Sequence, residues 1–352
     1  MKIIYAVCSW GLGHATRSLP IIRKLLHESN EVTIISDGRA LNLLKKELNE
    51  TVTFVDIPDY PLLVSENKQQ FIAKSMVYWP LFIHRMEAGL QELARLLNKQ
   101  PCDRIISDGR YDMYSKKIPS FFISHQMRIM NPLRIKMFER GSERFNLFFF
   151  KRFKKIIIPD YKTDDLSGDL SHNLDRIDEN NLHYVGVLSD FKKKNLKKDI
   201  DYFVSLSGPE PQRSILEKKI LSEIHDLTGK IVISLGKTEY EEKMNNESIK
   251  IFTYLSKEER EEVLNKSKLV ISRSGYSTIM DLAVIGTKAL MIPTPGQIEQ
   301  EYLAAYHNSK NTFYSINQQD LSLRSDAKKA QGSQGCNKPC DVSKSVEQII
   351  QL

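Results

Sequence analysis

The chain has few cysteines and no long apolar run, and each scarcity excludes a class of protein. Its 352 residues include four cysteines, too few and too scattered for the disulfide framework of a small secreted domain. The longest apolar run, residues 76–83, contains Pro80 and falls far short of the roughly 20 residues that a membrane-spanning helix needs. Residues 1–8 are apolar but are followed by no small-residue cleavage pattern, which indicates a first strand rather than a signal peptide. We therefore predict a cytoplasmic protein.

Metal ligands and nucleic-acid-binding signatures are also scarce. Cys336 and Cys340 lie close in sequence, but a structural zinc site needs four ligands and no other cysteine is near them. The formal net charge of +7 is concentrated locally, and no recognised nucleic-acid-binding module accompanies it. We therefore expect no metal site and no nucleic-acid partner.

Positive charge is concentrated between residues 133 and 155, where eight basic and two acidic residues give a local net charge of +6. The same segment holds six phenylalanines. One interpretation is a core helix with its phenylalanines packed on a sheet and its lysines solvated. The other is a membrane-surface contact through Phe145 to Lys155, where each basic residue near anionic headgroups contributes about 1 kcal/mol. The pattern leaves both open.

The remaining composition is that of a globular protein, with 41% hydrophobic and 27% charged residues in a length that suits two domains. Short β-branched runs alternate with amphipathic stretches, which is typical of parallel sheets covered by helices. We predict an α/β fold of two Rossmann-like, doubly wound domains, at residues 1–165 and 201–340. A polar junction is expected at 166–200 and a carboxyl-terminal helix at 341–352. Residues 322–341 are rich in Ser, Lys, Gln and Gly, which predicts an exposed loop.

The expected elements follow from this alternation. Strands are expected at residues 3–7, 32–36, 53–57, 104–107, 121–124, 156–159, 183–185, 202–206, 231–235, 250–252, 269–272 and 289–292. Helices are expected at residues 14–28, 40–48, within 69–97, and at 133–153, 212–223, 258–265, 277–285 and 298–306.

One six-residue string, Ile-Ile-Ser-Asp-Gly-Arg, occurs twice, at residues 34–39 and 105–110. Each copy stands at the end of an expected strand. In open α/β sheets, ligands bind outside the carboxyl ends of the strands. We therefore expect Asp-Gly-Arg turns along the ligand-binding edge of the first sheet.

A glycine-rich turn follows the first expected strand. Gly11 and Gly13 allow a tight turn and a close approach of the backbone to a ligand, and the helix expected from His14 directs free N–H groups at any bound anion. Thr16 stands where the dinucleotide fingerprint has its third glycine, so that fingerprint is absent. The turn, with Arg17, therefore predicts either an acceptor-binding site or a plain strand-to-helix connection.

Two further strand ends in the first half carry Asp108, Arg110 and His125. Because successive strand ends lie side by side in such sheets, we expect His14, Asp108 and His125 to converge. A histidine near its normal pKa is a suitable general base at neutral pH. These residues therefore predict a catalytic group beside an acceptor pocket, to which Arg110 would contribute.

The second half repeats the pattern of small-residue turns that open helices. The turn at Ser207 and Gly208 precedes a helix carrying Arg213, which offers backbone N–H groups, a hydroxyl and a guanidinium to phosphate. A second turn, at Ser274 and Gly275, opens another helix. Carboxylates and amides at the neighbouring strand ends suit the hydroxyls of a sugar or a ribose, namely Asp281, Gln300 and Glu301.

The string Ser272–Asp281, the stretch from Gly286 to Pro293 and the run Gln297 to Glu301 together resemble the donor domain of the MurG-like glycosyltransferases. The first-half Gly-x-Gly-His-x-x-Arg resembles relatives in the wider superfamily. The resemblance implies the GT-B fold, two Rossmann-like domains facing a central cleft. It also implies inverting transfer without a bound metal or cofactor, since helix N-termini and cationic side chains stabilise the leaving group.

Roles carry over by resemblance to matching positions. Asp281 corresponds to the acid that holds the ribose hydroxyls, and Gln300 with Glu301 to the pair that reads the donor sugar. The remaining donor-binding positions implied by the resemblance are Ser207 and Gly208 for phosphate, Ser274 and Gly275 for the diphosphate, and the backbone of Tyr254 and Leu255 beside a uracil.

One position departs from the family pattern. Relatives often place an arginine after a Val-Gly pair near the domain junction, where it neutralises the diphosphate, whereas this chain has Asp190. An acid there would repel phosphate, so either Lys192 to Lys194 or Arg213 substitutes, or the donor geometry differs.

These observations predict a hexosyl- or N-acetylhexosaminyltransferase. The expected donor is a nucleotide sugar, UDP-linked, and the acceptor a glycan or a lipid-linked hydroxyl of a cell-envelope glycan, reached at the inner face of the membrane. His14 is the expected general base, and Asp108 and His125 either orient it or bind the acceptor. The expected acceptor-binding residues are Gly11, Gly13, Arg17 and Arg110. Two alternatives keep the fold: a nucleotide-sugar hydrolase or epimerase, and a non-catalytic sugar-nucleotide-binding subunit.

Overall fold

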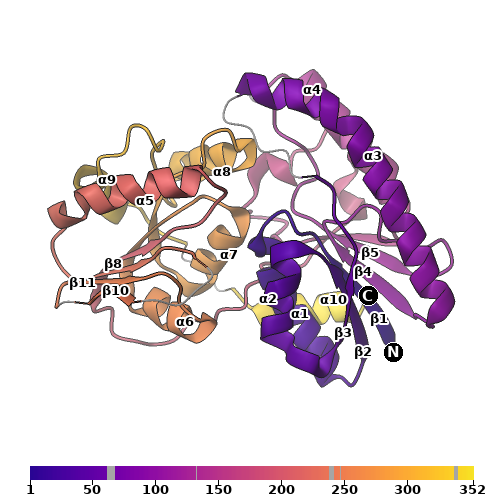
Figure 1. Ribbon diagram of the computed structural model, residues 1–352. Coiled ribbons are helices and arrows are strands. Elements are labelled where there is room, and N and C mark those ends of the chain that lie inside the picture. Colours follow the sequence, from indigo (N-terminus) through magenta and orange to yellow (C-terminus); the bar gives the residue numbers. More distant parts are fainter. Residues whose placement is uncertain (62–67, 132, 238–241, 246, 337–339) are drawn as a thin grey trace. The chain divides into compact units, whose positions relative to one another are not determined.

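The computed structural model describes residues 1–61, 68–131, 133–237, 242–245, 247–336 and 340–352 (Figure 1). The chain forms two compact units. The first comprises Met1–Asp190 together with Asp341–Leu352, and the second comprises Phe191–Cys340.

The first unit is built on a seven-stranded sheet in the order β3-β2-β1-β4-β5-β6-β7. Neighbouring strands pair in parallel, and β1 and β4 are adjacent although β2 and β3 lie between them in sequence. The order therefore reverses between β1 and β4, which is where ligands bind in doubly wound folds. The strands are β1 (Lys2–Val7), β2 (Glu31–Ser36), β3 (Thr53–Asp56), β4 (Arg104–Asp108), β5 (Ser120–Ile123), β6 (Lys155–Ile158) and β7 (Leu182–Tyr184), and the helices are α1 (Leu12–His27), α2 (Gly38–Leu48), α3 (Lys68–Lys99), α4 (Lys136–Phe150) and α10 (Val342–Ile350).

Residues 182–184 correct the predicted domain organisation. The strand expected at 183–185 was assigned to the junction 166–200, but β7 pairs with β6 as the seventh strand of the first sheet. The first unit therefore runs to Asp190, and only residues 191–200 of that junction lie outside it. The closing helix α10 also packs on α1 in the first unit, and Arg104 Nη1 donates to the carbonyl of Ile350 at 2.8 Å.

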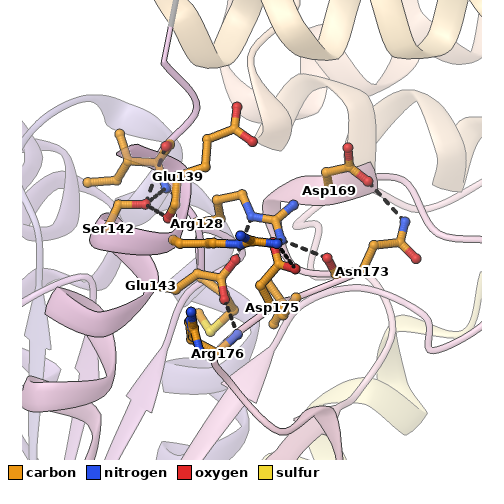
Figure 2. Close-up of polar contacts among 12 residues, drawn as sticks. Arg128, Glu139, Ser142, Glu143, Asp169, Asn173, Asp175 and Arg176 are labelled. Carbon is orange, nitrogen blue, oxygen red and sulfur yellow. Dashed lines mark hydrogen bonds and ion pairs between the residues drawn. The ribbon is translucent and has the colours of Figure 1, made fainter. Parts of the chain in front are cut away.

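Helix α4 is fastened to the polar loop that follows β6 by buried charges (Figure 2). Glu143 is fully buried and accepts from Arg128 Nε at 2.7 Å and from the backbone N–H of Arg176 at 2.6 Å. Arg128 Nη2 donates to the carbonyl of Asn173 at 2.6 Å. Removing one partner of a buried pair leaves an uncompensated charge, so the network fixes this helix on its loop.

The second unit is also seven-stranded, in the order β10-β11-β9-β8-β12-β13-β14, with β10 antiparallel and the other pairs parallel. The order reverses between β8 and β12. Its strands are β8 (Ile200–Ser205), β9 (Ile231–Ser234), β10 (Glu242–Asn245), β11 (Ile249–Phe252), β12 (Ser267–Ser272), β13 (Lys288–Met291) and β14 (Tyr314–Ser315), and its helices are α5 (Gln212–Glu223), α6 (Lys257–Lys266), α7 (Tyr276–Ile285), α8 (Ile298–Ser309) and α9 (Leu323–Gln331).

The prediction of two doubly wound α/β domains is confirmed, and the exposed loop expected at 322–341 is wrong for residues 323–331. Helix α9 covers residues 323–331, and its buried Leu323, Ala327 and Ala330 join the core of the second unit. These three positions recur at helical spacing, so they form an apolar stripe that the polar residues around them conceal in an average composition. Strands β10 and β14 were not predicted.

Candidate functional site

His14 and Asp108 lie together at the switch point of the first sheet, where β1 and β4 are neighbours. Asp108 is the last residue of β4 and lies opposite Val7 of β1 in the register. His14 stands in the first turn of α1, which directly follows β1. Its Nδ1 lies 2.7 Å from Asp108 Oδ1, and the side chain of His14 keeps 24% of its surface exposed while that of Asp108 has none.

The protonation of this pair follows from charge. Burial alone would raise the pKa of Asp108, but the charge of Arg17, then that of His14, and the hydrogen bonds from both outweigh it and hold the pKa well below its usual range. The carboxylate is therefore ionised and can only accept. Because the carboxylate cannot donate, His14 Nδ1 must carry the proton of the 2.7 Å contact and donate it to Asp108 Oδ1, to which Arg17 Nη2 also donates. The lone pair of His14 then lies on Nε2, the atom that can take a proton.

Three more side chains complete this cluster, which we call the histidine–aspartate cluster (His14, Arg17, Ser18, Asp108 and His125). Arg17 Nε and the Ser18 hydroxyl donate to Asp108 Oδ2 at 2.8 and 3.0 Å. Arg17 Nη1 donates to Nδ1 of the buried His125 at 3.2 Å. The expected meeting of three strand ends is therefore found. Ser18 was not predicted, although its position four residues after His14 places both on one face of α1.

Gly109 makes room for the His14 ring. Its φ of +79° lies in the region that glycine favours, and a side-chain Cβ there would come within 2.9 Å of His14 Cε1 and 3.0 Å of Cys8 Cβ. Gly38, the equivalent residue of the repeated string, also has a positive φ but no atom within 4 Å of its Cβ position. The string at residues 105–110 therefore ends beside His14, whereas the same string at residues 34–39 only begins helix α2.

Gly109→Ala is accordingly expected to lower the turnover number more than Gly38→Ala. An alanine at a positive φ lowers stability by roughly 1 kcal/mol in either variant. Only the alanine at position 109 also displaces the His14 ring. Steady-state kinetics and melting temperatures of the two variants separate the effects. Equal losses of kcat in both variants would contradict this role of Gly109.

The structure contradicts the acceptor-binding role predicted for Arg110. Its side chain is fully buried. It donates from Nε and Nη2 to Asp112 at 3.0 and 2.8 Å and from Nη1 to the carbonyl of Ile57 at 3.0 Å. Arg17 is 3% exposed and its donors are directed at Asp108 and His125, so it orients the cluster. The exposed Gly11, at the start of α1, remains a predicted acceptor contact together with the half-buried Gly13.

In the second unit, the predicted donor residues follow the carboxyl ends of parallel strands. Ser207 and Gly208 follow β8, and Tyr254 and Leu255 follow β11. Gly275 is the residue before α7, which opens after β12. Helix N-termini and strand ends at one edge of a sheet suit a phosphorylated ligand. Asp281, half-buried, lies in the second turn of α7.

Three residues predicted to bind the sugar donor, Ser274, Gln300 and Glu301, make hydrogen bonds within the second unit. The Ser274 hydroxyl donates to the carbonyl of Gln300 at 2.7 Å, and Gln300 Oε1 accepts from the backbone N–H of Thr294 at 2.9 Å. Glu301 Oε1 accepts from the backbone N–H of Gly296 at 3.0 Å. The first turn of α8 is thus held against the start of α7 and the end of β13.

Arg213 and Asp190, two charged residues predicted to act on the donor's phosphate, are both paired with other side chains of the chain. Arg213, expected to bind phosphate, donates to Glu210 and to Glu217, the latter at 2.6 Å. These carboxylates offset its charge. Asp190, expected to repel phosphate, lies in the first unit and accepts from Arg23 at 2.6 and 2.7 Å.

Two family models match the chain. The model of the glycosyltransferase family 28 C-terminal domain matches residues 211–332, and that of glycosyl transferase family 1 matches residues 1–80. An uncharacterized glycosyltransferase of Methanosarcina mazei is 25% identical over 320 residues, which cover 86% of this chain and 82% of that protein. The UDP-N-acetylglucosamine–N-acetylmuramyl-(pentapeptide) pyrophosphoryl-undecaprenol N-acetylglucosamine transferase of Clostridium perfringens is 26% identical over 297 residues, covering 80% and 75%.

Solved structures share the fold at low identity. The glycosyltransferase of kitacinnamycin matches with a TM-score of 0.64 at 14% identity, covering 99% of this chain and 94% of that chain. MurG of Acinetobacter baumannii matches with a TM-score of 0.57 at 13% identity over the full length of both chains. The chain is therefore a glycosyltransferase with the GT-B fold. Within that class it is MurG-like, since its second unit carries the family 28 domain and curated MurG enzymes are among its relatives.

Proposed function

We propose that this glycosyltransferase transfers a hexosyl or N-acetylhexosaminyl group from a UDP-sugar to an acceptor hydroxyl, with inversion and with His14 as the general base. The hydrogen bond from His14 Nδ1 to the ionised Asp108 carries the proposal, because it leaves Nε2 ready to accept a proton.

The proposed step balances without a metal. The acceptor oxygen forms a bond to the anomeric carbon as the bond from that carbon to the phosphate oxygen breaks. The electron pair of the broken bond leaves with the nucleoside diphosphate, and the acceptor's proton passes to His14 Nε2. Helix N-termini that follow the strands of the second unit would stabilise the departing charge.

The UDP donor is supported by the named relatives, several of which are UDP-N-acetylglucosamine transferases. A thermal-shift panel tests it. UDP and UDP-N-acetylglucosamine are expected to raise the melting temperature more than ADP, GDP or dTDP, since a ligand at 100 times its Kd stabilises by about 2.7 kcal/mol. A panel in which no nucleotide shifts the transition would contradict the proposal. Incubating the selected donor without acceptor separates transfer from hydrolysis or epimerisation, which would consume it alone.

We also propose a surface for a lipid-linked acceptor. It differs from the predicted segment Phe145 to Lys155, in which Phe148 is 60% exposed. No helix in the described residues is long and apolar enough to cross a bilayer. Phe149, Phe150 and Phe153 are buried in the core, as the alternative interpretation of that segment predicted.

We place the proposed membrane contact at the start of α4 instead. Leu133, Met137 and Phe138 are 71%, 70% and 59% exposed, and the Arg128–Glu143 network holds this helix on its loop (Figure 2). Interfacial insertion of such side chains is driven by apolar burial.

Changing Met137 and Phe138 to serine is expected to abolish co-flotation with anionic liposomes while leaving nucleotide binding intact. Ile215→Ser, which changes a 46%-exposed apolar residue of α5, is the matched control. Unchanged flotation of the double variant would remove this surface from the proposal.

A further inference from the structure

Arg273 differs from the other buried arginines in its surroundings. Arg17, Arg110 and Arg128 each pair with a carboxylate. Arg273 is 1% exposed, and in the part of the chain that the structure describes its guanidinium is paired with no carboxylate. Its four hydrogen bonds all go to neutral oxygens: Nη1 to the carbonyls of Ile292 and Pro293 at 3.2 and 3.1 Å, and Nη2 to the carbonyl of Gln212 and to Gln318 Oε1 at 2.9 and 2.7 Å.

The guanidinium carries its charge at neutral pH. Burial lowers the pKa of Arg273 to about 10, which still leaves it protonated. A guanidinium has five N–H donors, and four are used. The fifth, on Nε, has no acceptor among the residues that the structure describes. Burying a charge with neither a counter-charge nor a full set of hydrogen bonds destabilises a fold, so such an arrangement needs a reason outside the free protein.

A second unpartnered donor lies beside the first. Thr294 follows β13 and is 1% exposed, and its hydroxyl has no hydrogen-bond partner in the described part of the chain. Both atoms face Gly208, which follows β8 with a φ of +112°. A Cβ on Gly208 would lie 3.5 Å from Thr294 Oγ1 and 3.7 Å from Arg273 Nε, and within 4 Å of no other non-neighbouring residue. The missing side chain of Gly208 therefore leaves a space beside two donors that lack acceptors.

The three residues occupy adjacent strand ends. Strands β8, β12 and β13 are neighbours in the sheet, and Gly208, Arg273 and Thr294 follow their carboxyl ends. The sheet order reverses between β8 and β12, so this is the expected ligand-binding edge of the second unit. An oxygen seated in the space beside Gly208 would complete the hydrogen bonds of both donors and supply the missing negative charge.

We propose that this space, the Gly208 cradle (Gly208, Arg273 and Thr294), binds an oxygen of the donor's diphosphate, and that Arg273 supplies the buried positive charge that holds the departing nucleoside diphosphate. The inference rests on the proposed function and adds Arg273 and Thr294 to Gly208, which the family resemblance already implies as a phosphate contact. The charge of the diphosphate grows as the sugar leaves, so the interaction with a fixed cation in a buried site strengthens along the reaction. Arg273 takes the place that Arg213, offset by Glu210 and Glu217, was predicted to fill.

Thr294→Val is the sharpest test because it removes a hydroxyl that has no partner in the free protein. The melting temperature of this variant is expected to equal or exceed that of the wild type, since a buried unpaired polar group is lost. Its affinity for UDP is expected to fall roughly 10- to 100-fold, because one hydrogen bond to a charged oxygen is lost. Its affinity for uridine, which has no phosphate, is expected to change by less than about twofold. Loss of a residue with only a structural role would not lower the affinity for UDP while leaving the affinity for uridine and the melting temperature unchanged.

Two further variants complete the experiment. Arg273→Met is expected to lower UDP affinity more than Thr294→Val does and to spare uridine. Thr287→Val is the matched control: Thr287 is also fully buried in the second unit, but its hydroxyl accepts from Lys198 Nζ at 3.0 Å. That change should lower stability and leave the ratio of UDP to uridine affinity unaltered.

The outcomes are separable. Wild-type protein that binds no nucleoside diphosphate would overturn the proposed function and this inference with it. Wild-type protein that binds UDP, alongside a Thr294→Val variant that binds it equally well, would overturn the cradle alone. A parallel loss of UDP and uridine affinity in Thr294→Val would also overturn the cradle, since it would indicate general damage to the site.

Discussion

Replacing His14 with alanine is expected to lower kcat by roughly 10²- to 10⁴-fold, the usual contribution of a general base. Nucleotide affinity should stay within about twofold of the wild type, because His14 belongs to the first unit and the predicted donor residues all belong to the second. Single-turnover kinetics and calorimetric titration with UDP measure the two quantities separately.

The control for this change is His27→Ala. His27 is exposed at the other end of the same helix and has no part in the histidine–aspartate cluster, so its removal should leave kcat unaltered. A His14→Ala enzyme that keeps its kcat, or one that loses UDP affinity instead, would exclude His14 as the base.

Replacing Asp108 with alanine is expected to destabilise the first unit by about 3–5 kcal/mol, because it leaves the buried Arg17 without its counter-charge. The same change frees the His14 ring to rotate and to change tautomer, so kcat should fall as well. Both tryptophans, Trp10 and Trp79, belong to the first unit, so urea unfolding followed by tryptophan fluorescence reports on that unit. Asp103→Ala, which removes an exposed carboxylate that accepts from the backbone of Lys2, is the control.

The destabilisation should depend on pH in a defined direction. The pKa of Asp108 is depressed in the folded protein, so its contribution to stability is fully present above the unfolded-state pKa of about 3.9 and is lost as the pH falls below it. The difference in unfolding free energy between wild type and Asp108→Ala should therefore be constant from pH 6 to 8 and shrink below about pH 4. A difference that grows in acid would contradict the ionised state assigned to Asp108.

The alternation of strands and helices was readable from the sequence because the central strands, such as β1 and β4, are buried on both faces of the sheet and are read as apolar runs. Helix α9 was not predicted, because its apolar stripe consists of one leucine and two alanines, and alanine contributes little to hydrophobic periodicity. Strand β7 was seen but misassigned, because its polar surroundings resemble a linker until its pairing with β6 is known.

The histidine–aspartate cluster was predictable for a different reason. Parallel strands place successive carboxyl ends side by side, so His14, Asp108 and His125 had to meet if the strands were correct. The partners of the arginines were not predictable. Arg110 and Arg213 stand in turns that suit an anionic ligand, yet the structure gives both of them carboxylates of the chain itself. Arg273 stands between Ser272 and Ser274 in the turn after β12 and gave no signal of its own, since only coordinates reveal a missing acceptor.

Because the last helix, α10, packs in the first unit, the two units cannot be exchanged by a single cut in the chain. The second unit is an insertion in the sequence of the first: it begins after Asp190 and ends before Asp341. Exchanging it for the donor unit of another glycosyltransferase therefore requires two splice points, not one. A chimaera that keeps residues 1–190 and replaces everything downstream would discard α10 and expose the flank of α1, the helix that carries His14, the proposed general base.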